Sequence, residues 1–230
     1  MRFNKTILKA GALLGVGITS LTEANAQKAP QKQPNILYVF ADQMRADALG
    51  YTGNAKAYTP NIDRFAKEAL DFSNAVSSTP VSAAHRASLL TGKYQSSTGM
   101  VINELNMNLN HRFLGHCLGD AGYDLGYVGK MHLNDRYFRP YEPGPQRFGF
   151  DGYWAAYSFN HRSYHAKYHT DIDGEVNKVV ELTGVYSPKV FTDLCMDYIR
   201  TASQNDKPFA VFLSWNPPHD PWTEENTDPK

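Results

Sequence analysis

The sequence predicts an α/β fold in which a largely parallel or mixed central sheet is flanked by helices. Three observations favour this class. Apolar runs alternate with amphipathic helical segments, the apolar runs are continuous, and polar motifs follow directly after three of them. Continuous apolar runs are typical of strands that are buried on both faces of a parallel sheet. The chain shows no repeat or heptad pattern that would favour another architecture.

The expected elements can be placed in order along the chain. Residues 36–41 form an apolar run and are expected to be a buried strand. Residues 60–70 are expected to form a helix, because Thr59 stands at the N-cap position, Pro60 at the first helical position, and Phe65 with other apolar residues on one face. The later elements are expected at 112–120 (helix), 124–128 (strand), 187–202 (helix) and 209–215 (strand).

The first 26 residues have the pattern of a secretory signal peptide. Three basic residues precede an apolar core over residues 10–21, and Ala24-Asn25-Ala26 offers a small-residue cleavage site. The core is too short to span a bilayer. We therefore expect an exported protein, periplasmic or secreted, whose mature chain covers residues 27–230 and has no membrane span.

Composition favours a globular enzyme. Hydrophobic residues make up 42% of the chain and the formal net charge is zero, so neither a nucleic acid nor a membrane surface is an expected partner. The two cysteines, Cys117 and Cys195, lie in predicted helices, where we expect buried and unpaired thiols. Neither stands in a recognisable catalytic context.

Polar motifs follow three of the predicted strands. Asp42-Gln43 follows the first, Lys130-x-His132 follows residues 124–128, and His219 follows residues 209–215. The carboxyl ends of parallel strands collect the functional site in α/β sheets. The oxygens of Asp42 and Gln43 suit a hard cation such as Ca²⁺ or Mg²⁺, although Asp42 closing a turn is the alternative.

Lys130 and His132 are two residues apart, so they share one side of an extended chain. Ser82 and Arg86 are four apart and share one face of a helix that begins near Ala83. At the amino end of that helix Ser82 is a candidate nucleophile, because free N–H groups there favour an anion. The alternative is an N-cap serine with a surface arginine.

Ser82-x-Ala84-x-Arg86 followed by Leu-Leu-Thr-Gly resembles the signature of the type I sulfatases, in the alkaline-phosphatase-like superfamily. Ala84 stands where the signature most often has proline, a variant that the family accepts. Further matching blocks occur in the family's order at 34–43, 59–63, 126–132 and 217–219. The resemblance implies that a sulfatase-maturating enzyme oxidises Ser82 to formylglycine (3-oxoalanine) before export.

The resemblance also assigns roles to the polar motifs. It implies a Ca²⁺ site, with Mg²⁺ as the alternative, at three residues: Asp42, Gln43 and Ser82. It implies that Arg86 and Lys130 stabilise charge on the sulfate, with His132 as the base and His219 as the acid that protonates the leaving alcohol. The substrate would be a sulfated carbohydrate or another sulfate ester.

Residues 151–175 are rich in aromatic residues and contain His161, His165 and His169, which are four apart and would share a helical face. We expect a substrate-facing insertion, in which His161 and His165 contact sugar hydroxyls or sulfates; a polar surface loop is the alternative. A zinc site is a further reading, although nothing else indicates soft ligands. Asp171-Ile-Asp173-Gly174 is expected to be a turn.

Sulfatases of this type are longer, and the later Asp-His-Gly or Asp-Asn-Gly segment of the family is absent from these 230 residues. We therefore expect residues 27–230 to be the N-terminal part of a sulfatase catalytic domain, with uncovered apolar faces. Two other functions stay open. One is a phosphate-ester hydrolase that uses unmodified Ser82, and the other is a non-catalytic fragment that binds sulfated glycans.

Overall fold

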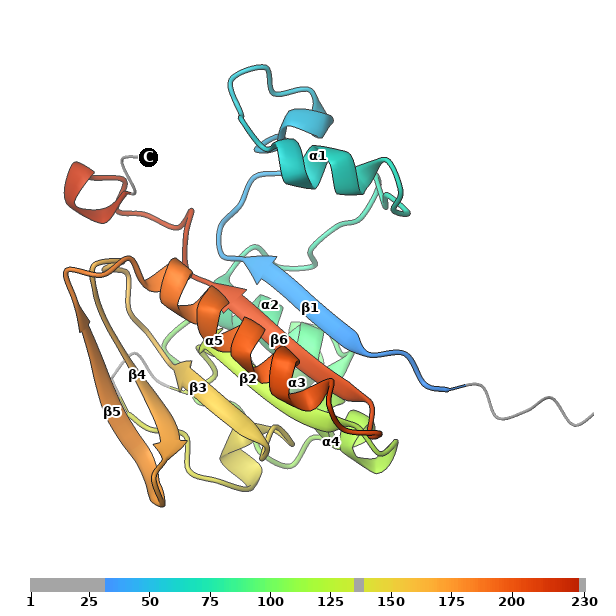
Figure 1. Ribbon diagram of the computed structural model, residues 1–230, viewed down its shortest axis with the longest axis vertical. Coiled ribbons are helices and arrows are strands. Elements are labelled where there is room, and N and C mark those ends of the chain that lie inside the picture. The colour runs from blue at the N-terminus through green and yellow to red at the C-terminus, as the bar shows by residue number, and fades with distance from the viewer. Residues whose placement is uncertain (1–31, 135–138, 228–230) are drawn as a thin grey trace, which may run out of the picture. The chain divides into compact units, whose positions relative to one another are not determined.

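The computed structural model describes residues 32–134 and 139–227 (Figure 1). The expected signal peptide and its cleavage site therefore lie outside the described residues. Among the helices in the described ranges, none has both the length and the apolar character needed to cross a membrane.

The described strands form one mixed sheet in the order β1-β6-β2-β3-β4-β5. Neighbours from β1 to β3 are parallel, and β4 and β5 are added antiparallel. This arrangement confirms the predicted fold class. The strands are β1 (Ile36–Ala41), β2 (Asp124–Lys130), β3 (Tyr153–Tyr157), β4 (His165–Ile172), β5 (Glu175–Thr183) and β6 (Phe209–Trp215).

Helices cover both faces of the sheet (Figure 1). On one face α5 packs against β6, β2 and β3, and on the other lie α2, α3 and α4. The helices are α1 (Pro60–Ala66), α2 (Ser82–Thr91), α3 (Gln95–Thr98), α4 (Leu114–Asp120) and α5 (Ser187–Ala202), with 3₁₀ turns η1 (Gly50–Thr52), η2 (Pro145–Arg147) and η3 (Glu224–Asn226).

The side chains of successive residues in the buried strands pack into two separate hydrophobic cores. Tyr127 of β2 packs in a cluster with Leu90 of α2, whereas its neighbour Val128 packs in a cluster with Phe191 of α5. Because strand side chains alternate between faces, a strand between two helical layers must be apolar at every position. This explains the continuous apolar runs in the sequence.

Several predicted boundaries are confirmed, and some expectations are wrong. The strands at 36–41 and 209–215 and the helix at 187–202 have the predicted bounds. The helix predicted over 60–70 ends at Ala66, and Thr59 at its N-cap position makes no side-chain cap; its hydroxyl donates to Asp63 instead. The helix predicted from 112 begins at Leu114, and the strand predicted over 124–128 continues to Lys130.

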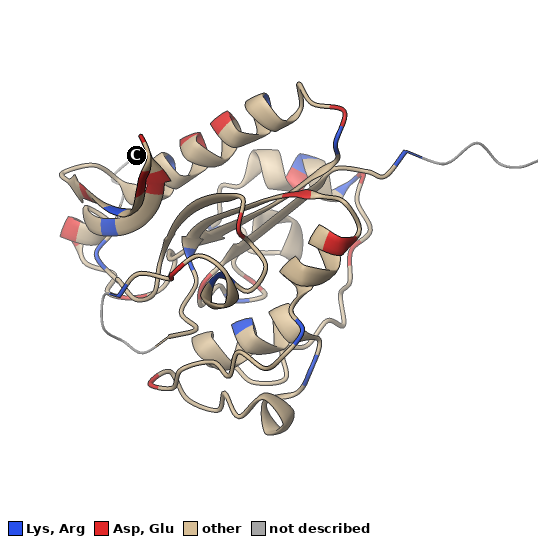
Figure 2. Cartoon of the chain, turned by 90° about the horizontal axis from the view of Figure 1, so that it is seen from below, with Lys and Arg blue, Asp and Glu red and all other residues tan. Residues whose placement is uncertain are grey.

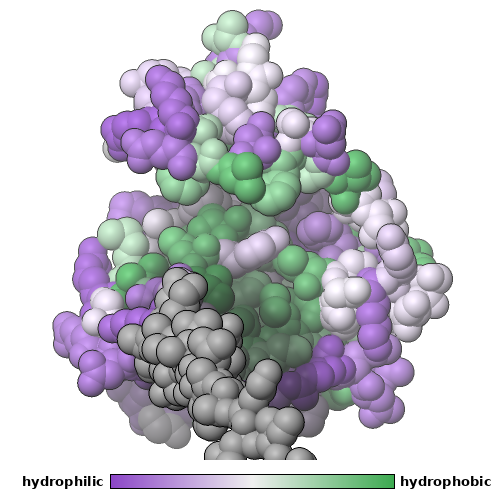
Figure 3. All heavy atoms as spheres, turned by 90° about the vertical axis from the view of Figure 1, so that its right-hand side faces the viewer, coloured by the Kyte–Doolittle hydropathy of each residue, from purple (hydrophilic) through white to green (hydrophobic). Residues whose placement is uncertain are grey.

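The first strand is not buried as predicted. Within the described residues β1 pairs with β6 alone, so it is an edge strand, and Leu37 and Val39 are 53% and 42% exposed. Apolar residues are exposed over much of the face seen in Figure 3. The apolar run therefore predicted the strand correctly. Its burial depends on which other elements pack beside it, and the run alone does not determine that.

The segment 151–175 is neither helical nor an aromatic surface insertion. It forms β3 and β4, and the side chains of Trp154, Tyr157 and Tyr168 are buried in the two cores. Asp173 and Gly174 form the predicted turn, with positive φ angles that suit a tight hairpin between β4 and β5.

The two cysteines differ in exposure. Cys195 is buried as expected, whereas Cys117 is exposed, and both thiols are free in the structure. Acidic and basic residues are interspersed in the view of Figure 2.

Candidate active site

The predicted site residues gather at the carboxyl ends of three adjacent parallel strands. Asp42 follows β1, Lys130 ends β2, and the loop with His219 follows β6, which lies between the other two. The first turn of α2 brings Ser82 to the same place, where its hydroxyl lies 3.0 Å from Asp42 Oδ2. The common location expected for motifs that follow parallel strands is confirmed.

The Asp42 carboxylate is the centre of the cluster. Its Oδ2 accepts hydrogen bonds from Lys130 Nζ at 2.6 Å, Ser82 Oγ at 3.0 Å and an Arg86 nitrogen at 3.3 Å. Burial alone would raise the pKa of Asp42, but the charges of Arg86 and Lys130 outweigh it and hold that pKa well below its usual range. The carboxylate is therefore ionised at neutral pH.

Arg86 is a buried and fully engaged cation, not the surface charge of the alternative interpretation. Its side chain is 2% exposed. One terminal nitrogen donates to the Lys130 carbonyl at 2.6 Å and to Ser214 Oγ at 2.7 Å, and Nε donates to Ser82 Oγ at 3.2 Å. The guanidinium also lies 4.8 Å from the centre of the Phe40 ring. These contacts fix its orientation beside Ser82.

Ser82 is the first residue of α2, and Val81 takes the N-cap position. The N-cap interpretation of Ser82 is therefore wrong. Besides Asp42 and Arg86, its Oγ lies 3.1 Å from His132 Nδ1. A hydroxyl in contact with a carboxylate, a guanidinium and an imidazole has the surroundings of a reacting group.

Lys130 and His132 both reach this cluster, although not as neighbours along an extended chain. The strand ends at Lys130, and His132 has a left-handed backbone with φ 51° that directs its ring to Ser82. Burial lowers the pKa of Lys130 to about 8 in spite of Asp42. Burial and then the charges of Lys130 and Arg86 lower the pKa of His132 to about 3, so this imidazole is neutral at neutral pH.

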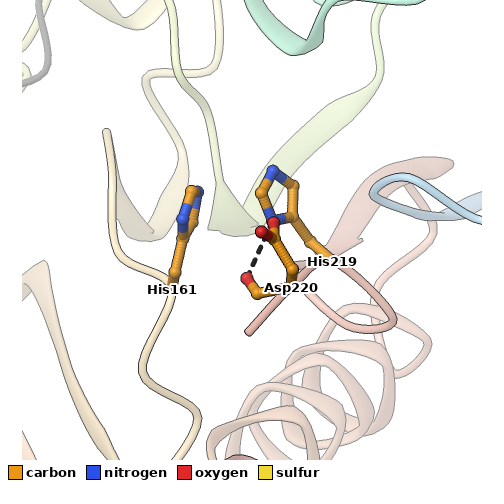
Figure 4. A group of neighbouring side chains, drawn as sticks. All are labelled: His161, His219 and Asp220. Atoms are coloured by element: carbon orange, nitrogen blue, oxygen red, sulfur yellow. Dashed lines mark hydrogen bonds and ion pairs between the residues drawn. The ribbon is translucent and has the colours of Figure 1, made fainter. Parts of the chain in front are cut away.

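His219 and His161 form the rim of the site (Figure 4). Their ring centres are 3.9 Å apart, and His219 Nδ1 lies 2.7 Å from Asp220 Oδ1. Burial, followed by the charges of Lys130 and His219, lowers the pKa of His161 to about 4. His165, the other predicted substrate contact, is exposed at the start of β4 and lies outside this group.

A cleft of about 520 Å³ joins the inner cluster to the rim, and it is lined by Asp42, Gln43, Ser82, His85, Arg86 and His219 among others. Arg86 and Asp42 line the cleft, and the buried Lys130 lies directly behind Asp42, with Nζ 2.6 Å from Asp42 Oδ2. Two cations and one anion therefore surround Ser82, an arrangement that favours an anionic group.

Three residues of the site were missed by sequence reasoning. Ser214 and Asn216 hold Arg86 and Lys130, the latter through a 3.2 Å hydrogen bond from Lys130 Nζ to Asn216 Oδ1. Ser214 interrupts an otherwise apolar strand and Asn216 follows its end, which are the signals that mark them. His85 also lines the cleft, with Nδ1 3.0 Å from Ser77 Oγ, but no sequence pattern singles it out.

The residues predicted to bind a metal fit a hard cation. The hydrogen bonds from Ser82, Arg86 and Lys130 to Asp42 all end on Oδ2, so Oδ1 can bind a metal ion. Gln43 Oε1 and Ser82 Oγ add oxygens, and Asp220 N–H donates to Gln43 Oε1 at 3.2 Å. Oxygen donors suit Ca²⁺, which takes about six to eight of them, so further ligands must complete the site.

Comparison with known proteins gives a consistent result. Residues 34–230 match the Sulfatase family. The chain is 40% identical over 195 residues to an ulvan-active sulfatase of Formosa agariphila, covering 85% of this chain and 37% of that protein. It is 32% identical to an endo-4-O-sulfatase of Bacteroides thetaiotaomicron, covering 92% of this chain and 49% of that protein.

Solved structures agree. The crystal structure of a putative sulfatase from Bacteroides fragilis matches with a TM-score of 0.74 and 30% identity, over 84% of this chain and 45% of that one. A protein solved in complex with its substrate, D-glucosamine-2-N,6-O-disulfate, matches with a TM-score of 0.70 and 28% identity, over 84% and 36%. The chain thus spans less than half the length of each of these four proteins.

Proposed function

The chain belongs to the sulfatase family, and on that premise we propose that it supplies the N-terminal part of a sulfuric ester hydrolase that acts on sulfated carbohydrates. The observation that carries the proposal is the pair of buried cations around Ser82 and Asp42. Arg86 donates to Ser82, Lys130 pairs with Asp42, and their two charges exceed the single charge of Asp42. A sulfate monoester has one negative charge, which this excess would neutralise.

The chain's own residues would divide the chemistry among them. Formylglycine at position 82, once hydrated, would supply a geminal diol. One hydroxyl would attack sulfur while the S–O bond to the alcohol breaks. The second hydroxyl would then expel sulfate and restore the aldehyde. Arg86 and Lys130, held by Ser214 and Asn216, would stabilise charge on the sulfuryl oxygens. Ca²⁺ at Asp42, Gln43 and position 82 would add positive charge there.

Two histidines would move the protons. His132 is neutral and holds Nδ1 at 3.1 Å from the position 82 oxygen, so it is placed to accept a proton. His219, at the rim of the cleft, would protonate the leaving alcohol. Its Nδ1 is oriented by Asp220.

A carbohydrate substrate is favoured by the rim and by the relatives. The Formosa protein is named for ulvan, and the complex described above holds a disulfated glucosamine. At the rim Trp222 is 73% exposed, while its Nε1 donates to the Pro218 carbonyl at 2.6 Å. An indole ring that is exposed but fixed is suited to pack on a sugar ring. His161 would contact hydroxyl or sulfate oxygens.

Maturation and export complete the proposal. A signal peptide over residues 1–26 would direct the chain to the periplasm or outside the cell, after a maturating enzyme has oxidised Ser82. The relatives do not favour the phosphate-ester alternative, because the Formosa and Bacteroides thetaiotaomicron proteins are both named as sulfatases.

Mass spectrometry of the tryptic peptide Glu68 to Arg86 from the native host tests the modification. Formylglycine lowers the mass of this peptide by about 2 Da. An unmodified peptide from an active protein would overturn the formylglycine mechanism and favour the phosphate-ester alternative.

Turnover of a sulfated carbohydrate by the whole protein tests the site. Arg86→Lys should lower kcat by about 100-fold or more, because lysine cannot replace the several fixed donors of the guanidinium. Arg45→Lys is the matched control, since that side chain is 81% exposed. Equal loss in both variants would refute the role of Arg86, and binding of sulfated glycans without turnover would favour the non-catalytic alternative.

A further inference from the structure

Three side chains with metal-binding atoms converge at the rim of the cleft. His161 comes from the loop after β3, and His219 and Asp220 come from the loop after β6. One donor atom from each can be chosen so that all three lie within 4.8 Å of one another. Figure 4 shows the His161 ring facing His219 and Asp220.

His161 brings a nitrogen that lacks a partner. Its Nε2 is buried and makes no hydrogen bond within residues 32–134 and 139–227. A buried polar atom of this kind is costly unless a donor or a cation reaches it. The atom is therefore available to a ligand that binds at the edge of the ring.

The two loops are held together before any ligand binds. Asn226 Nδ2 donates to the carbonyls of His161 and Pro221, each at 2.9 Å, and Asn226 Oδ1 accepts from the Ser163 N–H. This side chain ties the loop with His161 to the loop with His219 and Asp220. A preorganised pair of loops lowers the conformational cost of binding.

The donor set determines the class of cation. Two imidazoles and one carboxylate are typical ligands of Zn²⁺ and related transition metals, whereas Ca²⁺ and Mg²⁺ prefer oxygen alone. The rim set is thus chemically distinct from the oxygen set of Asp42, Gln43 and Ser82. It also differs from the His161, His165 and His169 set considered from sequence, because β4 takes the latter two out of reach.

We propose that His161, His219 and Asp220 bind one divalent cation of the Zn²⁺ class, and that this cation inhibits the enzyme. The cation takes the place of the proton between His219 Nδ1 and Asp220 Oδ1, and water completes its coordination. The inhibition rests on the proposed function, because a cation between Nδ1 and Asp220 replaces the contact that orients the His219 ring toward the leaving alcohol. The binding of the cation does not depend on it.

The test is a titration of the purified mature protein with Zn²⁺ against a chromophoric chelator, in an excess of Ca²⁺. The wild type is expected to bind one Zn²⁺. His161→Ala and Asp220→Asn are expected to bind it at least about tenfold more weakly. His165→Ala is the matched control, because this histidine is exposed and outside the cluster.

Wild-type affinity in both His161→Ala and Asp220→Asn, or loss of the site in His165→Ala, would overturn the proposal. Asp220 is exposed, so Asp220→Asn decides the result even where His161→Ala fails to fold. In turnover assays Zn²⁺ should inhibit the wild type, relative to its zinc-free rate, more strongly than either rim variant. Turnover in no sample would refute the sulfatase proposal, while the titration would still decide the cation site.

Discussion

The segment 43–81 and the region of the sheet with α2 depart from the usual distribution of side chains in opposite ways. In the segment 43–81, which carries α1, apolar residues lie in water: Tyr58 is 91% exposed, Val76 89% and Leu70 80%. In the region of the sheet and α2, charges lie inside, since Lys130 is 0% exposed and Arg86 2%. Both arrangements are costly without specific partners.

The two regions differ in whether these side chains have partners among the described residues. The buried cations have theirs, because Asp42, Ser214 and Asn216 all contact them. The exposed apolar residues of the segment 43–81 pack into neither of the two cores. The cluster around Asp42 is therefore assembled by the contacts described here, whereas the segment beside it is a surface of the kind that associates.

Removing the Asp42 carboxylate, which Lys130 and Arg86 share, should have the largest effect on stability. Asp42→Ala leaves Lys130 and Arg86 buried without their counter-charge, so we expect a loss of about 3 to 5 kcal/mol in the free energy of unfolding. Asp47→Ala in the segment 43–81 is the control, because its ion pair with Arg45 is exposed and should contribute less than about 1 kcal/mol.

Denaturant unfolding followed by circular dichroism measures both variants. Similar losses would show that the buried cluster contributes no more to stability than a surface pair.

Acid should destabilise the region of the sheet by a smaller amount for each pH unit. The pKa of His132 is lowered from 6.5 to about 3. Between these pH values the unfolded chain therefore binds a proton that the folded chain does not bind. The contribution of His132 to stability is intact above pH 6.5 and is lost as the pH falls from there through the folded pKa. The slope from this one group is at most about 1.4 kcal/mol per pH unit.

His132→Gln should reduce that slope, while His165→Gln, at an exposed position, should leave it unchanged. Part of the slope should remain in His132→Gln, because the pKa of His161 is lowered to about 4. Unfolding free energies measured at intervals between neutral pH and pH 4 give the comparison. A slope that is as steep in His132→Gln as in the wild type would assign the acid sensitivity to another group. Asp42 adds its own loss only at lower pH, since its stabilising charge disappears below the ordinary carboxyl range.

Changes in the segment 43–81 should affect stability least. Phe65 and Leu70 are 71% and 80% exposed, so Phe65→Ser and Leu70→Ser should change the free energy of unfolding by no more than about 0.5 kcal/mol. They should reduce self-association, because apolar surface in water favours it. Sedimentation velocity measures the association. A large loss of stability would show that these side chains are packed in solution.

Local patterns explain which elements were predictable. The strands β1 and β6 and the helix α5 have the predicted bounds because apolar runs, turn residues and a Ser-Pro helix start are encoded within each segment. The pair Ser82 and Arg86 was predictable for the same reason, since residues four apart meet on any helix. The convergence of the strand-end motifs followed from the parallel sheet alone.

Contacts between distant segments explain what was missed. Nothing local distinguishes the exposed β1 from the buried β6, because exposure depends on which strand lies beside each. His161 was grouped with His165 and His169 by sequence spacing, yet it meets His219, 58 positions further along the chain, through a loop. Trp154, Tyr157 and Tyr168 were expected at the surface because their alternation in β3 and β4 was not recognised.

What the sequence by itself determined is the family, the bounds of β1, β6 and α5, and the polar motifs at the strand ends, since each depends on residues that lie close together in the chain. Only the tertiary structure decided that Arg86 and Lys130 are buried and charged around Asp42, and that His161 joins His219 and Asp220. These properties arise from desolvation and from distances across the sheet, and both exist only once the strands are side by side.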